Sequence, residues 1–296
     1  MAEKRVNASE PFIKTFLKRI LEDLDYGLYR AGLKKMHPHI RVMSIDETID
    51  EMLNTKKSLV RFGDGEVAMM RGVNLKLQQV SPGLVDRMKD IIGYHDEDLA
   101  VSVQDIFDGL SLYVPASRRF WRSHLFVCRK FYEKLCNPDR VYASTAFSRC
   151  YITIDDKSQC AGWFEKIRSI WKDRDVTVVE GPDSWSGVCN DLLSEAASVR
   201  RILGPARNAW DRYDEILSAC REEAKGQLFL LALGPCAKPL AEDLFHEGYR
   251  VIDIGNMEIE YTWFLMGATD KSVGHAPMTE EQRALYESQI VKRIGA

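Results

Sequence analysis

The chain has 296 residues, 45% hydrophobic and 29% charged, a composition typical of soluble globular proteins. The formal net charge of −3 and an isoelectric point near 6.1 give no overall attraction to nucleic acid. No apolar stretch approaches the roughly 20 residues of a membrane span. The start of the chain lacks the apolar region of a signal peptide, so we expect a cytoplasmic protein.

The cysteine and histidine patterns exclude two kinds of site. The seven cysteines are an odd number without a C-x-x-C pair, which argues against a disulfide framework and a structural zinc site. We expect most of them to be small buried residues. Four histidines lack metal-ligand spacing and are interpreted as structural or exposed: His95, His124, His246 and His275.

Residues 10–35 are predicted to form a helix that ends before His37-Pro38-His39. Ser9 could cap its start. Its polar side mixes basic and acidic residues, which favours packing on the domain or on a second subunit over contact with a membrane surface. We therefore assign residues 1–40 to an N-terminal helical extension and residues 41–296 to the main domain, and leave a homo-oligomer or a peripheral membrane contact open.

Short apolar stretches alternate with helical patterns in the main domain. Strands are predicted at 58–60, 99–103, 141–143, 176–179, 202–203, 228–233 and 251–254. Helices are predicted at 45–53, 66–71, 82–94, 117–135, 157–171, 190–201, 209–224 and 239–247, and the segment from Ala268 reads as a polar tail. Ser44 and Glu47 form a capping-box pattern before the first of these helices. The alternation predicts an α/β fold, a mainly parallel sheet with helices on both faces.

The stretch Arg61-Phe62-Gly63-Asp64-Gly65-Glu66 follows the first predicted strand of the main domain. Gly63 and Gly65 permit a sharp turn and a close approach of the backbone to a ligand. The carboxylates of Asp64 and Glu66 are hard oxygen ligands suited to Mn²⁺ or Mg²⁺. Arg61, and Arg149 after another strand, can each face a phosphate. A polar turn with surface carboxylates is the alternative interpretation.

Two further segments could contact a nucleotide. Gly234-Pro235 leads from a strand into a helix, whose first N–H groups can bind an anion, although an ordinary strand–helix turn reads the same way. Dinucleotide and P-loop fingerprints are absent. The polar loop 180–191 could lie over a nucleotide or its sugar, with Asn190 as one of the contacts. Alternatively, Asn190 only caps the helix that is predicted to follow.

Three carboxylates follow the last predicted strand, Asp253, Glu258 and Glu260. One of them could accept a proton from a sugar hydroxyl as a general base. The alternative is a charged loop at a helix start, where acidic residues favour the helix dipole.

Residues 45–269 resemble the bacterial glycosyltransferases of the GT-D fold, once grouped as a domain of unknown function. The resemblance rests on sequence blocks in one order: R-F-G-D-G-E at 61–66, F-S-R-x-Y-I at 147–152, E-G-x-x-S at 180–184, G-V-x-N-D-L at 187–192, P-A-[KR]-N-A at 205–209, L-A-L-G-P at 231–235 and D-I-G-x-x-[DE]-x-E-Y-x-W-F at 253–264. The chain departs from the family pattern at Trp185, Cys189, Cys236 and Asn256.

The resemblance implies a metal-dependent transferase that uses a UDP-sugar, typically UDP-glucose, and holds metal and diphosphate at Asp64 and Glu66. We expect transfer of a hexose to a hydroxyl of a glycan or glycoprotein with inversion at the anomeric carbon. A metal-dependent phosphohydrolase and a non-catalytic nucleotide-binding subunit are the alternatives. Nucleic acid is not an expected partner.

Overall fold

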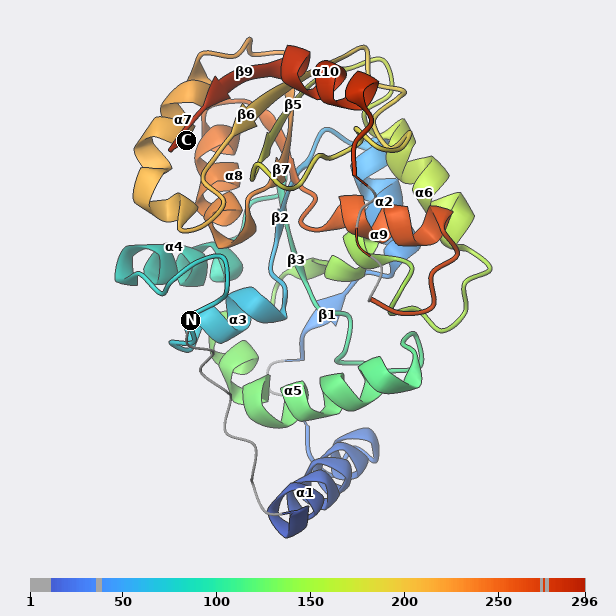
Figure 1. Ribbon diagram of the computed structural model, residues 1–296. Helices are drawn as coiled ribbons and strands as arrows, with labels where there is room; N and C mark the ends of the chain where they lie inside the picture. Colours follow the sequence, from blue (N-terminus) through green and yellow to red (C-terminus); the bar gives the residue numbers. More distant parts are fainter. Residues whose placement is uncertain (1–11, 36–38, 272–273, 275–276, 296) are drawn as a thin grey trace, which may run out of the picture.

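The computed structural model describes residues 12–35, 39–271, 274 and 277–295. In this described part of the chain, nine strands form one sheet in the order β1-β4-β3-β2-β8-β7-β5-β6-β9, and all pairs of neighbouring strands are parallel (Figure 1). The chain runs outward from β2 through β3 to β4 and then crosses to β5 in the other half. Ligands of such sheets bind at the carboxyl ends of strands near a change of this kind. The predicted fold class is confirmed.

The strands of the sheet are β1 Arg41–Val42, β2 Ser58–Arg61, β3 Leu99–Val103, β4 Val141–Ser144, β5 Asp175–Glu180, β6 Ser198–Leu203, β7 Leu228–Ala232, β8 Arg250–Asp253 and β9 Ile290–Arg293. The α-helices are α1 Phe12–Arg30, α2 Ile45–Asn54, α3 Asp64–Met70, α4 Pro82–Gly93, α5 Pro115–Leu135, α6 Cys160–Ser169, α7 Tyr213–Arg221, α8 Ala237–His246, α9 Met257–Leu265 and α10 Glu280–Gln289. Short 3-10 helices are η1 Thr145–Arg149, η2 Ala209–Arg212 and η3 Gly234–Cys236.

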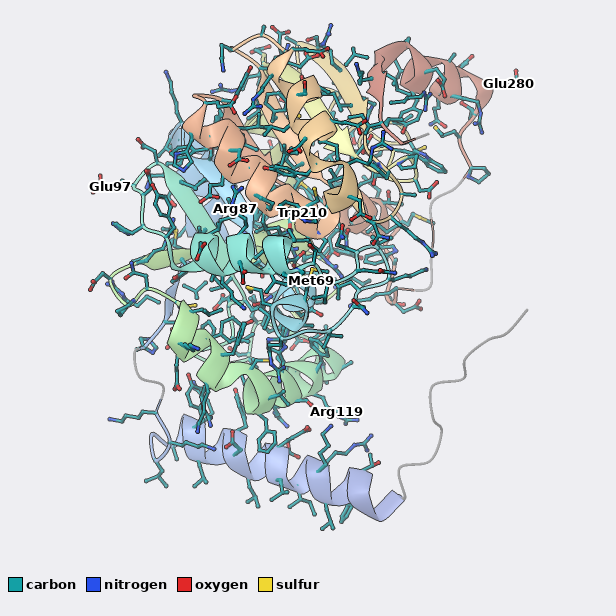
Figure 2. All side chains as sticks on the ribbon, turned by 90° about the vertical axis from the view of Figure 1, so that its left-hand side faces the viewer. Met69, Arg87, Glu97, Arg119, Trp210 and Glu280 are labelled. Carbon is teal, nitrogen blue, oxygen red and sulfur yellow. The ribbon has the colours of Figure 1, made fainter. Side chains whose placement is uncertain are left out.

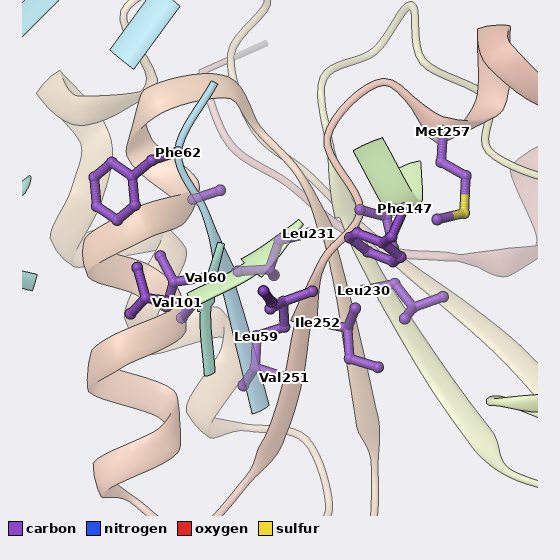
Figure 3. Close-up of a cluster of buried hydrophobic side chains, with 14 of the residues drawn as sticks. Leu59, Val60, Phe62, Val101, Phe147, Leu230, Leu231, Val251, Ile252 and Met257 are labelled. Carbon is purple, nitrogen blue, oxygen red and sulfur yellow. The ribbon is translucent and has the colours of Figure 1, made fainter. Parts of the chain in front are cut away.

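The core lies along the central strands (Figure 3). Leu59, Val101, Leu230 and Ile252 come from four adjacent strands and are fully buried. Helices cover both faces, with α4, α7 and α8 on one side and α2, α6 and α9 on the other (Figure 1). Because both faces are covered, the central strands read as continuous apolar runs in the sequence.

Helix α1 lies on the outer side of α5, away from the sheet (Figures 1 and 2). The Tyr29 hydroxyl donates to the carbonyl of Phe107 at 2.5 Å, and the Ser123 hydroxyl donates to Glu22 at 2.7 Å. The helix predicted over 10–35 thus spans 12–30 in the structure. The predicted cap at Ser9 and the break at His37-Pro38 lie outside the described residues.

The prediction of a helix over 190–201 is wrong. Residues 190–197 form turns, and β6 begins at Ser198. The Asn190 side chain accepts from the N–H of Leu192 at 3.0 Å, a local bond that competes with helix formation. Val199 and Ile202 are β-branched and pair with β5, so strand pairing overrides the local pattern.

Both ends of the main domain carry elements that the prediction missed. The short strand β1 pairs with β4 at one edge of the sheet. Helix α10 and strand β9 lie within the segment from Ala268 that was predicted to be a polar tail, and β9 pairs with β6 at the other edge. Other predicted helices and strands appear with shifted ends, and the capping box at Ser44 and Glu47 is confirmed. Among the described residues, no helix is both long enough and apolar enough to cross a membrane.

Candidate functional site

The turn after β2 sends its two carboxylates in different directions. Asp64 and Glu66 are the first and third residues of α3. Residues two apart in a helix point about 200° apart around its axis. Asp64 is exposed at the mouth of a cavity, whereas Glu66 is 7% exposed and lies in the interior. The two carboxylates predicted as metal ligands therefore do not face the same space.

Glu66 belongs to a buried ion cluster with Lys238 of α8 and Asp253 of β8. The Lys238 ammonium lies 3.0 Å from Glu66 Oε1 and 3.1 Å from Asp253 Oδ2. The other oxygen of Glu66 accepts from the N–H of Gly63 at 2.8 Å, and Asp253 accepts from the N–H of Arg61 at 3.3 Å. The cluster therefore ties the turn after β2 to two other elements.

The two carboxyl groups of this cluster respond differently to burial. Burial opposes ionisation of Glu66, but the charges of Lys238 and Arg61 outweigh it and lower its pKa. At Asp253 burial dominates and raises the pKa, and Lys238 offsets it only in part. Burial likewise opposes the charge on Lys238, but Asp253 and Glu66 prevail and raise its pKa. The cluster holds its lysine charged at neutral pH.

A cavity of about 580 Å³ opens at the carboxyl ends of β2, β3 and β4. Its lining combines basic, acidic and aromatic side chains from segments far apart in the sequence. These residues are Arg61, Asp64, Gln104, Tyr113, Val114, Ala116, Ser117, Phe120, Trp121, Thr145, Ala146, Arg149, Ile152, Thr153, Thr269, Asp270 and Lys271. Of the residues predicted for the site, it brings together Arg61, Asp64 and Arg149.

Arg149 is held by Glu260, a predicted base. Its Nε lies 3.0 Å from the carboxylate, which also accepts from the N–H groups of Tyr151 at 2.9 Å and Ile152 at 2.7 Å. Glu260 is fully buried and does not line the cavity. It therefore positions the arginine. Burial and the nearby Arg149 lower the pKa of Lys271, which also lines the cavity.

Arg61 lines the cavity, and one of its donors, the buried Nε, is unpaired within the described part of the chain. Gly255 has a φ of +52°, and a Cβ there would lie 3.1 Å from Arg61 Nη1, so this glycine leaves room for the guanidinium. A Cβ at Gly63 would lie 2.9 Å from Glu66 Oε2, and one at Gly65 would lie 3.3 Å from Leu75. Gly63 and Gly65 thus make room for neighbouring side chains, and neither lines the cavity.

A second cavity of about 220 Å³ lies in the other half of the sheet, beyond β7. It contains Gly234 and Pro235, which were predicted to bind the nucleotide, together with Gly181–Ser184 and Pro205. No Lys or Arg is among its lining residues. It is therefore less suited to a diphosphate than the larger cavity is.

Asn190, in the loop 180–191, contacts Glu258 of α9. Asn190 Nδ2 donates to Glu258 Oε1 at 2.6 Å, and the N–H of Gly187 donates to Oε2 at 2.7 Å. Burial raises the pKa of Glu258 to about 7. Neither residue lines a described cavity. They tie the loop to α9.

Of the two carboxylates predicted to hold a divalent cation, only that of Asp64 is open to the cavity. Among the described residues, no group of three or more His, Cys, Asp or Glu side chains could hold a metal ion. Mg²⁺ is often bound by one or two carboxylates together with substrate phosphates. Asp64 fits that open arrangement because it faces the cavity. Glu66 does not, because Lys238 and the N–H of Gly63 occupy its oxygens.

Sequence reasoning missed several residues that build the site. The sequence around Lys238, at the start of a helix, shows no functional motif. Its role is visible only in the structure, where it lies between the buried Glu66 and Asp253. Gln104 donates to the carbonyl of Phe62 at 3.0 Å and accepts from Tyr132 at 2.5 Å, which fixes the backbone of the turn after β2. Trp121 and Phe120 belong to the helix predicted over 117–135, and no signal in the sequence showed that both line the cavity.

A sequence model of the glycosyltransferase GT-D fold matches residues 59–281. The chain is 40% identical over 288 residues to the glycosyltransferase GlyD of Streptococcus pneumoniae serotype 4, which covers 94% of this chain and 35% of that protein. It is also 40% identical over 267 residues to the probable glycosyl transferase Gly of Streptococcus gordonii, covering 86% and 39%. The chain thus spans between a third and two fifths of the length of these curated relatives.

Solved structures match over their whole length. One, described as a domain of unknown function 1792 with a distinct glycosyltransferase fold, shares 35% identity with a TM-score of 0.83 and covers 93% of this chain and 100% of that chain. A glycosyltransferase of the same domain type from Streptococcus sanguinis shares 39% identity with a TM-score of 0.81 and covers 86% and 100%. The family match extends over most of the chain and includes the turn after β2, η1 and α9, so the chain belongs to the GT-D-fold glycosyltransferases.

Proposed function

We propose that this chain transfers a hexose from a UDP-sugar to a hydroxyl group of a glycan or glycoprotein, with the donor diphosphate in the larger cavity. The observation that carries the proposal is the convergence of Arg61, Arg149 and Lys271 with Asp64 on that cavity. Three basic groups together with the Asp64 carboxylate suit a ligand that carries phosphates and a cation.

The arginines would act on the charge that develops on the leaving UDP. Arg149 is held in place by Glu260, so its guanidinium needs no reorganisation when the glycosidic bond breaks. Arg61 lines the same cavity and would add a second positive charge beside the diphosphate. Bound Mn²⁺ or Mg²⁺, with Asp64 as protein ligand, would add Lewis-acid stabilisation of the diphosphate.

The acceptor would approach along α5. A smaller hollow adjoins the cavity and shares Asp64 and Phe120 with it. Ser123 and Arg71 line this hollow and offer polar contacts to a sugar, while the ring of Phe120 offers an apolar surface. An acceptor there would lie beside Asp64 and so beside the donor.

The base would be a carboxylate that reaches the cavity. Asp253, Glu258 and Glu260 are buried and do not line it, so positioning roles suit them better than proton transfer does. Asp64 and Asp270 are the acidic residues of the lining. If Asp64 holds a cation, Asp270 is the proposed base, and a single displacement would invert the anomeric configuration.

The test is a screen of UDP-hexoses against the purified chain with and without Mn²⁺, read by thermal shift and by UDP release. We expect binding that requires Arg149, so Arg149→Ala should lose it while the exposed-site control Arg212→Ala keeps it. Nuclear magnetic resonance of the product would give its configuration, and a retained configuration would exclude single displacement. UDP release that is independent of any acceptor would favour the phosphohydrolase. Binding without release in any acceptor mixture would favour a nucleotide-binding subunit.

A further inference from the structure

A chain of three hydrogen bonds runs from the turn after β2 to the small hollow beside the larger cavity. Gln104 Nε2 donates to the carbonyl of Phe62 at 3.0 Å. The Tyr132 hydroxyl donates to Gln104 Oε1 at 2.5 Å, and its oxygen lies 3.0 Å from Nε2 of His124. Gln104 and Tyr132 are buried, whereas His124 is partly exposed and lines the hollow. The chain therefore connects the backbone close to Asp64 with the surface proposed for the acceptor.

The same chain determines which nitrogen of His124 carries the proton. The carbonyl of Phe62 can only accept, so the Gln104 amide turns its NH₂ group to Phe62 and its oxygen to Tyr132. The single hydroxyl proton of Tyr132 is used on that amide oxygen. The Tyr132 oxygen can then only accept from His124, which requires a proton on Nε2. In a neutral imidazole this leaves Nδ1 as a hydrogen-bond acceptor.

The His124 ring is neutral, and its second nitrogen is open. Burial lowers the pKa of His124 to about 4, although the charge of Asp64 opposes this. A cation on Asp64 would lower that pKa further, so the ring is neutral at neutral pH with or without one. Within the described part of the chain, Nδ1 forms no hydrogen bond and is not sealed in the interior. A ligand in the hollow can therefore donate to it.

The surroundings of His124 in the hollow suit a sugar. The ring of Phe120 is stacked on the imidazole, with centroids 6.1 Å apart and planes 27° apart, and 48% of Phe120 is exposed. Arg71 also lines the hollow, and its Nη1 donates to Cys128 at 3.1 Å, which holds the guanidinium there. An apolar face beside a few placed polar groups is the usual make-up of a small-molecule site.

We propose that His124 binds a hydroxyl group of the acceptor through Nδ1, with Tyr132 and Gln104 holding the ring in the required tautomer. This role rests on the proposed transfer to a hydroxyl group and adds the residue that holds the acceptor. Asp64 lines both the hollow and the larger cavity, so an acceptor held by His124 would lie beside the donor. The acceptor hydroxyl donates and Nδ1 accepts, and deprotonation stays with the carboxylate of the larger cavity.

Nitrogen NMR of the whole chain, labelled in histidine, tests the tautomer without a donor. The signals of His124 are those lost in His124→Gln. At neutral pH they should show a protonated Nε2 and a bare Nδ1, and a panel of methyl hexosides should shift the Nδ1 signal. In Tyr132→Phe the Nε2 proton loses its acceptor, so the preference for this tautomer should weaken. A proton on Nδ1 in wild type, or an Nδ1 signal that no hexoside shifts, would overturn the proposal.

Kinetics test the role in acceptor binding. His124→Gln keeps an amide N–H for Tyr132 and removes Nδ1, so the KM for the acceptor should rise roughly 10-fold, the loss of about one hydrogen bond. Turnover and the calorimetric affinity for UDP with Mn²⁺ should stay unchanged. His124→Asn, whose amide oxygen can take the place of Nδ1, should keep part of the acceptor affinity. The exposed His95 gives the control, His95→Gln, which should behave as wild type.

Two kinetic outcomes would contradict the role of His124. One is a wild-type KM for the acceptor in His124→Gln. The other is a lower kcat at unchanged KM, which would make His124 a base. Circular dichroism checks that each variant keeps its fold. A wild type that binds no UDP-hexose would refute the proposed function, and the hexoside shift of Nδ1 would still decide on His124.

Discussion

Asp64 and Glu66 are one glycine apart in the sequence and lie in opposite environments. Asp64 faces a cavity lined by basic side chains, whereas Glu66 is buried against Lys238 and shares it with Asp253. The helical turn separates them, because residues two apart point about 200° apart around the axis. A D-x-E pattern at a helix start therefore supplies one carboxylate to a ligand and one to the interior.

The buried and the open side of this turn therefore have different roles. The buried cluster of Glu66, Lys238 and Asp253 fixes the backbone from which Arg61 and Asp64 project. The open side carries the charges that would meet a substrate. Changes on the buried side should therefore appear mainly in stability, and changes on the open side mainly in turnover.

The largest effect is expected for Lys238→Met, on the buried side. It leaves two buried carboxylates without their counter-charge, and breaking a buried ion pair costs about 3–5 kcal/mol. Urea unfolding measures the loss. Adding Glu66→Gln to Lys238→Met should recover part of it, because one uncompensated charge is removed. Lys172→Met is the control, since Lys172 is largely exposed on the surface, and it should change the unfolding free energy by no more than about 0.5 kcal/mol. Equal values for the two lysine variants would contradict the role of the cluster.

On the open side, Asp64→Asn should lower kcat by roughly 10²–10³-fold. The proposed cation would lose its protein ligand, and the leaving diphosphate would lose the stabilisation that the cation supplies. The unfolding free energy should stay within about 0.5 kcal/mol of wild type, because Asp64 is exposed. Steady-state kinetics with the donor found by the screen and a urea titration give both values. Asp86→Asn, at a similarly exposed position on α4, is the control. A stable variant with wild-type kcat would remove Asp64 from the site.

The sequence pattern was sufficient for the parallel sheet and for the turn after β2, because both depend on local runs of apolar residues and on strand–glycine junctions. It was insufficient where partners are distant in the chain. The helix expected over 190–201 gave way to pairing between β5 and β6, and β9 is a strand only because β6 offers it an edge.

The same limit applies to the site. Arg61, Asp64 and Arg149 were found because they follow strands, and strand ends meet at one edge of a parallel sheet. The burial of Glu66 could not be predicted, since it depends on Lys238, which is 172 positions away along the chain. Glu258 and Glu260 looked like free carboxylates in the sequence, yet groups distant in the chain hold both. The Gly187 N–H and the Asn190 side chain donate to Glu258. The N–H groups of Tyr151 and Ile152 donate to Glu260.

Glu258 is a further buried carboxyl group, and it should make the unfolding free energy depend on pH. Burial raises its pKa from 4.5 to about 7 in the folded protein. Between these values the folded chain keeps a proton that the unfolded chain has released. The stability from this group is therefore complete below pH 4.5 and is lost as the pH rises through about 7. The change amounts to about 3 kcal/mol.

Unfolding of wild type and Glu258→Gln across pH 4.5 to 8 tests this. The variant cannot titrate at this position, so the difference between the two curves should change by that amount over the window. The exposed Glu97 gives a control, Glu97→Gln, whose curve should run parallel to wild type (Figure 2). A difference curve without slope would show that Glu258 is ionised in the folded protein at acidic pH.

The smallest effect is expected for Arg149→Lys, which keeps the charge and removes the planar fork. The Arg149 Nε faces Glu260, so its terminal nitrogens are left for the cavity. A lysine has one charged nitrogen and cannot serve both partners. We expect donor affinity to fall by roughly 10-fold, about 1.4 kcal/mol, measured by calorimetry with UDP and Mn²⁺. Arg212→Lys is the matched control, because Arg212 makes a similar exposed pair with Glu215 at 2.5 Å and does not line the cavity. If Arg149→Lys keeps its donor affinity but loses unfolding free energy, Arg149 supports the fold, as the buried cluster does, and does not bind the ligand.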